Sequence, residues 1–237
     1  PGMPSAIRIL LAASVLVGAL GVRAGADAPS WEVVDEEDGI RLWRAAAGDA
    51  SAGRATTVVD APLCDVLAIV REVEGYCDWM ADCVEARELA RESPFANELY
   101  LRISGVGWVG VADRDVALAT RTARRGDHVV VSFAAQSGVA LHEADDTVRM
   151  PKLDGSYRLS PQADGRTEVD YRFVADLGGR VTDWIARRVV TRLPRETLRG
   201  LREVAARRRG TFAAVIAGWP ELAGGLPCAV TAVDADG

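Results

Sequence analysis

The sequence predicts an α+β domain in which a long antiparallel sheet curves around one C-terminal helix. From residue 84 to residue 176 the chain reads almost entirely as strands separated by Gly, Pro and Asp turns. From Gly179 the apolar spacing changes to that of a helix and continues to Val204. Because a long antiparallel sheet must bury one face, we expect the helix to cover it and a hydrophobic cavity to lie between them.

The first 26 residues read as a secretory signal peptide that precedes this domain. Arg8 stands before a short apolar stretch, 9–22, and the small residues of RAGADA supply two A-x-A cleavage sites. The stretch is shorter than the roughly 20 residues that cross a bilayer. An uncleaved anchor is the alternative. We therefore expect an exported protein, either periplasmic or secreted.

The exported part is acidic. Residues 1–26 hold two arginines and no acidic residue, so the remainder carries 26 basic and 34 acidic residues, a net charge of −8. Nucleic acid binding requires a basic surface, so this balance disfavours nucleic acid as a partner.

The elements before residue 84 are predicted one by one. WEVVDEEDGIRLWR, 31–44, forms two short strands around an acidic turn, and 55–61 forms a third strand. Pro62 opens a helix whose apolar residues follow helical spacing from Leu63 to Val73, and Gly75 ends it. A turn with Trp79 and Met80 follows.

Six strands and a long helix complete the predicted domain, which spans 29–209. The turns ARRGD (123–127), LDGS (153–156) and ADGR (163–166) predict antiparallel hairpins. Pro194 lies inside the C-terminal helix and is expected to kink it. The segment 210–237 is glycine-containing and poor in charge, so we expect a loose tail with a short helix before Trp219.

Four cysteines occur, and two of them are close in sequence. An oxidising compartment permits a disulfide between Cys77 and Cys83; two half-buried thiols are the alternative. Neither the cysteine spacing nor the two histidines support a zinc site, and the sequence indicates no cofactor.

Five segments, taken in order, resemble the START family of steroidogenic acute regulatory protein-related lipid transfer domains, which have the helix-grip fold. They are DGIRLWR, DWMADCVEARELA, GWVGVADRDVAL, VRMPKLDGSYRLSP and TEVDYRFVADLGGRVTDWI. The resemblance covers 31–209. The sequence departs from the family at Leu177, where a proline is usual, at Thr182, near which a proline is also usual, and at Val116, where an aromatic residue is usual.

The resemblance implies a cavity and suggests which residues line it. Adjacent strand residues point to opposite faces, so Arg114 and Asp115 cannot both face a cavity. The family suggests Glu98 as a pocket carboxylate that pairs with Arg114; an ion pair that fixes the rim of the sheet is the alternative. The candidate cavity residues are Trp79, Met80, Glu98, Trp108, Arg114, Tyr171, Trp184 and Ile185.

The resemblance implies a carrier of a hydrophobic ligand, such as a lipid or a sterol-like molecule, without catalysis. The sequence agrees, since it contains no G-x-S-x-G, no H-E-x-x-H and no phosphate-binding glycine loop. A ligand sensor or accessory protein is one alternative. A polyketide aromatase/cyclase that uses His128, Arg114, Glu98 or Tyr171 is another.

The C-terminal helix is unusually basic for an acidic protein. Its charges either contact anionic lipid transiently during loading or pair with acidic neighbours of the same chain. The arginines concerned are Arg187, Arg188, Arg192, Arg195, Arg199, Arg202, Arg207, Arg208 and Arg209.

Overall fold

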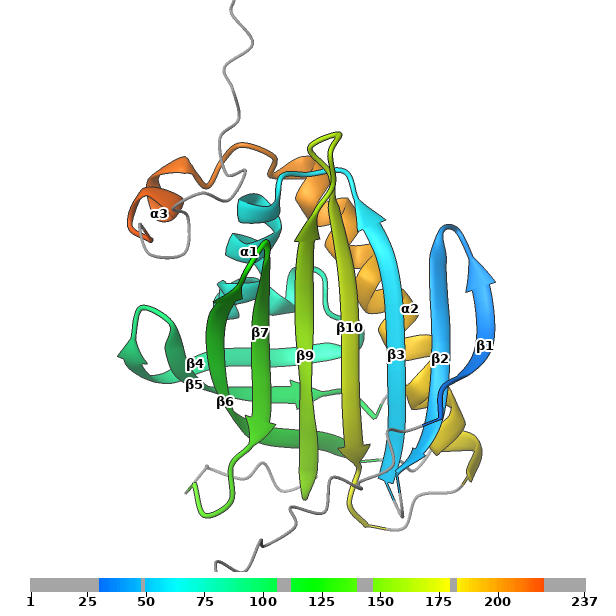
Figure 1. Ribbon diagram of the computed structural model, residues 1–237. Helices are drawn as coiled ribbons and strands as arrows, with labels where there is room; N and C mark the ends of the chain where they lie inside the picture. The colour runs from blue at the N-terminus through cyan, green and yellow to red at the C-terminus, as the bar shows by residue number, and fades with distance from the viewer. Residues whose placement is uncertain (1–29, 48–49, 106–111, 140–146, 180–182, 220–237) are drawn as a thin grey trace, which may run out of the picture.

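The computed structural model describes residues 30–47, 50–105, 112–139, 147–179 and 183–219 (Figure 1). Ten strands of these residues form one sheet in the order β1-β2-β3-β10-β9-β7-β6-β5-β4, with the short β8 paired in parallel with β6. The strands are β1 Glu32–Glu37, β2 Ile40–Ala47, β3 Ala50–Val59, β4 Cys83–Ser93, β5 Ala96–Ile103, β6 Asp113–Arg125, β7 His128–Ala135, β8 Thr147–Arg149, β9 Lys152–Pro161 and β10 Thr167–Asp176. The helices are α1 Leu63–Arg71, the 3-10 helix η1 Val73–Asp78, α2 Asp183–Arg207 and α3 Ala213–Ala217.

The predicted α+β architecture is confirmed. In Figure 1, β4 and β5 run across the direction of β9 and β10, so the sheet bends strongly around its concave face. Helix α2 packs mainly on β3 and β2, and α1 contacts α2 and β9. The core therefore lies between the concave face and these helices, and the outer face of the sheet is left to polar residues.

Helix α1 ends earlier than the sequence predicts. It stops at Arg71, because Glu72 adopts an extended backbone with φ −82° and ψ 90°. The chain then continues as η1, in which Gly75 lies rather than terminating α1. The carboxylate of Glu72 forms an ion pair with Arg208 beyond the end of α2, a distant partner that local helix signals do not report.

The hairpin predicted at LDGS is wrong, because residues 153–156 lie inside β9. Gly155 is needed for close packing and not for a turn. A Cβ atom added there would lie 2.2 Å from the backbone oxygen of Arg172 and 2.5 Å from Cζ of Phe133. The hairpins at residues 123–127 and 163–166 are present and join β6 to β7 and β9 to β10.

Part of the predicted loose tail is folded. Phe212 is 4% exposed and belongs to the core, and α3 follows it. The guanidinium of Arg71 lies 4.3 Å from the ring centroid of Trp219. These contacts hold the start of the tail near α1, with which α3 is in contact. Residues 220–237 and the predicted signal peptide lie outside the described residues. No helix among the described residues is both long and apolar enough to cross a membrane.

The loop between η1 and β4 is held in two ways. A disulfide joins Cys77 to Cys83, which is the first of the two alternatives that the sequence left open. Helix α2, which continues through Pro194, presses against the same loop. A Cβ atom on Gly200 would lie only 2.3 Å from the backbone oxygen of Trp79, so the helix approaches the loop at a distance that only glycine permits.

A buried ion pair joins β8 to β6. Asp115 is 1% exposed, and Arg149 donates two hydrogen bonds to its carboxylate, at 2.8 and 3.1 Å. The backbone N–H of Met150 donates to the carbonyl oxygen of Asp115 at 2.9 Å. Asp115 thus fixes the short strand β8 and the residue that follows it, Met150, which is 3% exposed.

We predict that Gly200→Ala lowers the free energy of unfolding. Helix propensity alone would raise it by about 1 kcal/mol, whereas forcing a methyl group against the Trp79 backbone costs about 1–3 kcal/mol. Chemical denaturation measures the sign of the change. Glu203→Ala, at an exposed position of the same helix, is the control and should change stability by less than about 0.5 kcal/mol. A Gly200→Ala variant as stable as the native protein would contradict this packing.

Asp115→Asn should lower the free energy of unfolding by about 3 kcal/mol, because it removes one partner of a buried ion pair. The control is Asp164→Asn, which breaks an exposed pair with Arg166 at 2.7 Å and should have little effect. Thermal unfolding of the two variants side by side tests the difference. Equal effects would show that the Asp115–Arg149 pair does not anchor β8.

Candidate ligand-binding cavity

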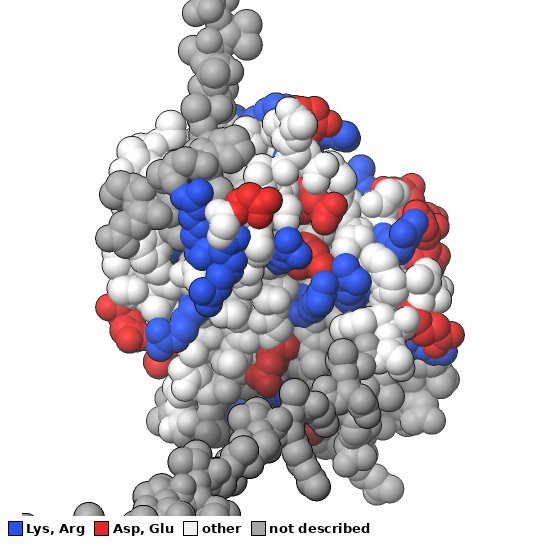
Figure 2. Space-filling view, in the orientation of Figure 1, with Lys and Arg blue, Asp and Glu red and all other residues white. Residues whose placement is uncertain are grey.

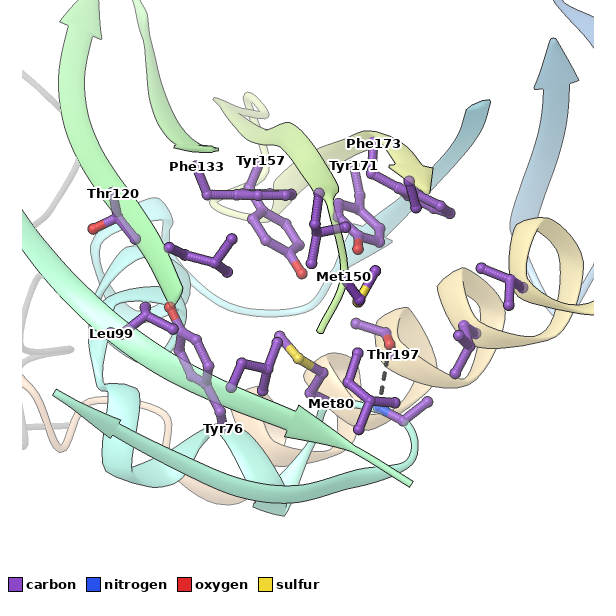
Figure 3. Close-up of a pocket in the computed structure, with 18 of the residues that line it drawn as sticks. Tyr76, Met80, Leu99, Thr120, Phe133, Met150, Tyr157, Tyr171, Phe173 and Thr197 are labelled. Atoms are coloured by element: carbon purple, nitrogen blue, oxygen red, sulfur yellow. Dashed lines mark hydrogen bonds between the residues drawn. The ribbon is translucent and has the colours of Figure 1, made fainter. Parts of the chain in front are cut away.

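A cavity of about 70 Å³ lies between the concave face of the sheet and α2 (Figure 3). One wall is aromatic and comes from β7, β9 and β10. Strand alternation turns Phe133, Tyr157, Tyr171 and Phe173 to the same inner face. Tyr157 and Tyr171 are direct partners in the register of β9 and β10, and their rings stack with centroids 4.4 Å apart.

Glycines on neighbouring strands make room for this aromatic wall. Phe173 is in register with Gly53 on β3 and with Gly155 on β9. A Cβ atom on Gly53 would lie 2.6 Å from Cζ of Phe173, so the ring occupies the space that a larger residue would fill. The aromatic rings can therefore lie close to the sheet.

The facing wall is aliphatic. Leu99, Leu101 and Ile103 of β5 and Leu118 of β6 point into the cavity, and α2 contributes Val189, Leu193 and Thr197.

Met80 and Ala81, from the loop that the disulfide closes, complete the lining on this side. The backbone N–H of Ala81 donates to Oγ1 of Thr197 at 3.2 Å, the bond drawn in Figure 3. Asp82, next in the chain, accepts a hydrogen bond from Arg192 at 3.2 Å. These two bonds dock the loop on the middle of α2.

Few polar groups reach the cavity, and most are already hydrogen-bonded. The Tyr76 hydroxyl donates to the Val70 carbonyl oxygen at 2.9 Å, and the Thr120 hydroxyl bonds to Asn97. The Tyr157 hydroxyl is buried and has no hydrogen-bond partner among the described residues. Burial raises the pKa of Tyr157 well above its ordinary value and raises the pKa of Tyr171 to about 12, so both phenols are protonated at neutral pH.

The predicted cavity residues have different places in the structure. Met80 and Tyr171 line the cavity. Trp79 is 4% exposed and lies behind the lining, with its ring edge-on to Tyr157 at 6.0 Å between centroids. Trp108 lies outside the described residues, as do the side chains of Trp184 and Ile185, whose backbone forms the first turn of α2.

The structure does not bring Glu98 and Arg114 together as a pocket pair. Glu98 is on the outer face of β5, opposite in direction to Leu99, and accepts a hydrogen bond from Gln136 at 3.2 Å. Arg114 lies at the start of β6, where it donates to the carbonyl oxygens of Leu177 at 3.3 Å and Ala112 at 2.5 Å. Strand alternation, which turns Leu99 inward, turns Glu98 outward.

Five of the described arginines of α2 and of the turn after it pair with acidic side chains of the same chain, and Arg202 donates to the backbone carbonyl oxygen of Asp38. The N-terminal strand pair and the segments around α1 supply most of these acids. The pairs are Arg192–Asp82, Arg195–Asp35, Arg195–Glu37, Arg199–Asp38, Arg208–Glu72 and Arg209–Asp60. This agrees with the second of the two predicted roles for these charges.

The outer face of the sheet likewise carries basic and acidic side chains together (Figure 2). Arg54 and Arg172 both bind Asp170, at 2.9 and 2.6 Å, and Arg54 also covers the ring of Trp43 at 4.4 Å. Strong ion pairing within the protein therefore accounts for several of the charges seen on this face.

Sequence reasoning missed Phe133, Tyr157, Phe173 and Met150 as cavity residues. A signal was available for the aromatic ones, because period-two alternation puts each of them on the apolar face of its strand. Which rings meet depends on the register between strands, which alternation alone does not give.

Three comparisons agree with this geometry. The family model of the START domain matches residues 20–207. An uncharacterized protein of Pseudomonas aeruginosa is 31% identical over 205 residues, which cover 85% of this chain and 100% of that protein.

Among solved structures, a STAR-related lipid transfer protein fragment from Xanthomonas axonopodis is 25% identical. The match covers 73% of this chain and 97% of that one, with a TM-score of 0.66. Human StAR-related lipid transfer protein 5 shares the fold at 13% identity, with coverage of 73% and 85% and a TM-score of 0.67. Together with the match to most of the chain, these findings show that this protein belongs to the START domain family.

Proposed function

We propose that this protein binds a hydrophobic ligand, a lipid or a sterol-like molecule, in the cavity under α2 and carries it through the cell envelope. The observation that supports the proposal is the lining, in which the described residues are aromatic and aliphatic with a few hydroxyls and no charged side chain. Burial of apolar ligand surface is favourable by about 25 cal/mol per Å². The proposal of an envelope location rests on the predicted signal peptide, which remains a prediction.

The cavity must widen to accept such a ligand. Its volume of about 70 Å³ is well below the roughly 300–1,000 Å³ of typical ligand pockets. Met80 and Met150 both line it, and methionine side chains are unbranched and adapt readily to a new neighbour. The loop that carries Met80 is docked on α2 through Ala81 and Asp82, so release of these two bonds would open the cavity on this side.

We favour binding over catalysis of the aromatase/cyclase type because of where the candidate residues lie. The candidate catalytic residues are four, and of these only Tyr171 lines the cavity. The other three are His128, Glu98 and Arg114. His128 lies at the start of β7, where its Nδ1 is 3.0 Å from Asp127. Glu98 is on the outer face and Arg114 is bound to two carbonyl oxygens. These positions separate the acid, base and cation that a reaction in the cavity would require.

Membrane contact during loading and unloading is part of the carrier proposal. The arginines of α2 that pair with Asp35, Asp38 and Asp82 would have to exchange these partners for lipid phosphates. We expect such contact to be transient and sensitive to salt, because exposed ion pairs are screened at high ionic strength.

Leu193→Trp should reduce affinity for the neutral fluorescent probe diphenylhexatriene at least about tenfold, because the larger ring fills the cavity from α2. Fluorescence titration measures this change. Ala206→Trp, at an exposed position of the same helix, is the control and should bind like the native protein. Equal binding by both variants would place the probe outside the cavity.

Transfer and sensing are separated by an assay between vesicles. A carrier should accelerate movement of a labelled neutral lipid from donor to acceptor vesicles, and Leu193→Trp should abolish the acceleration. A protein that binds the lipid in its cavity but leaves the transfer rate unchanged would instead be a sensor or accessory protein.

A further inference from the structure

The Tyr157 hydroxyl is a buried donor that makes no hydrogen bond of normal geometry to the described residues, although the Tyr171 phenol beside it interacts with it. Tyr157 is 4% exposed, and its oxygen has no hydrogen-bond partner among the described residues. Leaving a buried polar group unpaired costs about 1–3 kcal/mol, so native proteins rarely keep one without a reason. Because Tyr157 lines the cavity, an atom that enters the cavity, from a ligand or from a water molecule that a ligand displaces, could complete this bond.

The position of the hydroxyl is fixed rather than accidental. Tyr157 stacks on Tyr171 with an angle of 5° between the ring planes, and Trp79 meets it edge-on from behind. Figure 3 shows the hydroxyls of Tyr157 and Tyr171 pointing in the same direction, from the aromatic wall toward Met150. The wall therefore presents phenol oxygens to one place in an otherwise apolar space.

Two other hydroxyls of the lining, those of Tyr76 and Thr197, differ from this one. Tyr76 donates to the Val70 carbonyl oxygen, and Thr197 accepts a hydrogen bond from the Ala81 backbone. Their bonds hold the surrounding structure together whether or not a ligand is present. Tyr157 alone among these three gains a hydrogen bond only when something enters the cavity.

We infer that the cavity selects an uncharged hydrophobic ligand with one hydrogen-bond-accepting oxygen, a carbonyl or a hydroxyl, which binds the Tyr157 phenol. This inference rests on the proposed function of the cavity and names the chemical class of its ligand. A carboxylate or phosphate is disfavoured, because the described lining residues offer no cation to compensate a buried negative charge.

The Tyr157 phenol suits this role chemically. Burial raises its pKa well above the ordinary value, so it stays protonated and can donate across the physiological pH range. An apolar analogue that lacks the oxygen would fill the same space and leave the donor unpaired, which is the basis of selectivity for the polar ligand.

The test compares two rigid probes of the same skeleton, 9-fluorenone, which has one carbonyl oxygen, and fluorene, which has none. Equilibrium dialysis of the full chain should show tighter binding of fluorenone by about fivefold, the value of one neutral hydrogen bond. Infrared spectra of bound fluorenone should show the carbonyl stretch shifted to lower wavenumber relative to the free probe in hydrocarbon solvent.

Two tyrosine variants identify the donor. Tyr157→Phe should abolish both the preference for fluorenone and the infrared shift, while fluorene binds at least as well as before. Its melting temperature should not fall, because the substitution removes an unpaired polar atom. Tyr100→Phe is the matched control: Tyr100 is a buried tyrosine of β5 that does not line the cavity, so this variant should keep the preference for fluorenone.

The outcomes separate the inference from the proposed function. Equal affinity of the native protein for both probes would overturn the inference and leave the apolar cavity in place. A preference that survives in Tyr157→Phe would overturn the assignment to this residue. Failure of both probes to bind the native protein would overturn the proposed function and the inference together.

Discussion

The structure depends on how much of a strongly curved ten-stranded sheet a single helix can cover. Helix α2 packs mainly on β3 and β2, and α1 adds a contact with β9. The helices do not cover the inner faces of β7 and β10 or the middle of β9. The side chains there pack against side chains from the far edge of the sheet. Aromatic rings and methionines fill most of that space, and the cavity is the part that they do not fill. The cavity is therefore a consequence of the architecture before any polar residue is considered.

Ion pairs stabilise this arrangement at its edges. Arginines of α2 bind the acidic hairpin of β1 and β2 on one side and Asp82 on the other, so the helix is tied to the sheet and to the loop that bears Met80. The buried pair of Asp115 and Arg149 performs the same task for β8 and positions Met150. An acidic protein with a basic helix is thus explained largely by pairing within the chain. The described lining of the cavity is left apolar except for tyrosine and threonine hydroxyls.

The sequence was sufficient to predict the sheet, the long helix and the cavity between them, because apolar periods of two and 3.6 are local properties. It was insufficient where the role of a residue depends on a contact with a residue that is distant in the sequence. The sequence predicts Gly155 as a turn residue, whereas in the structure its small size makes room for Phe133 and for the backbone of Arg172. Glu98 was carried over from the family although alternation turns it outward. Tyr157 could be placed on the apolar face of its strand, but the lack of a normal hydrogen bond from its hydroxyl to the described residues depends on register and ring stacking, which only the folded chain defines.

The central claim is that the cavity holds a neutral hydrophobic molecule. It is tested most directly by native mass spectrometry of the protein purified from its own cell envelope, followed by identification of whatever is released into organic solvent. We predict one molecule per chain, uncharged, with a carbonyl or hydroxyl oxygen, and absent from a Leu193→Trp variant prepared in the same way. An empty protein that also takes up no lipid offered in excess would contradict the account, and a bound anionic molecule would contradict its description of the cavity.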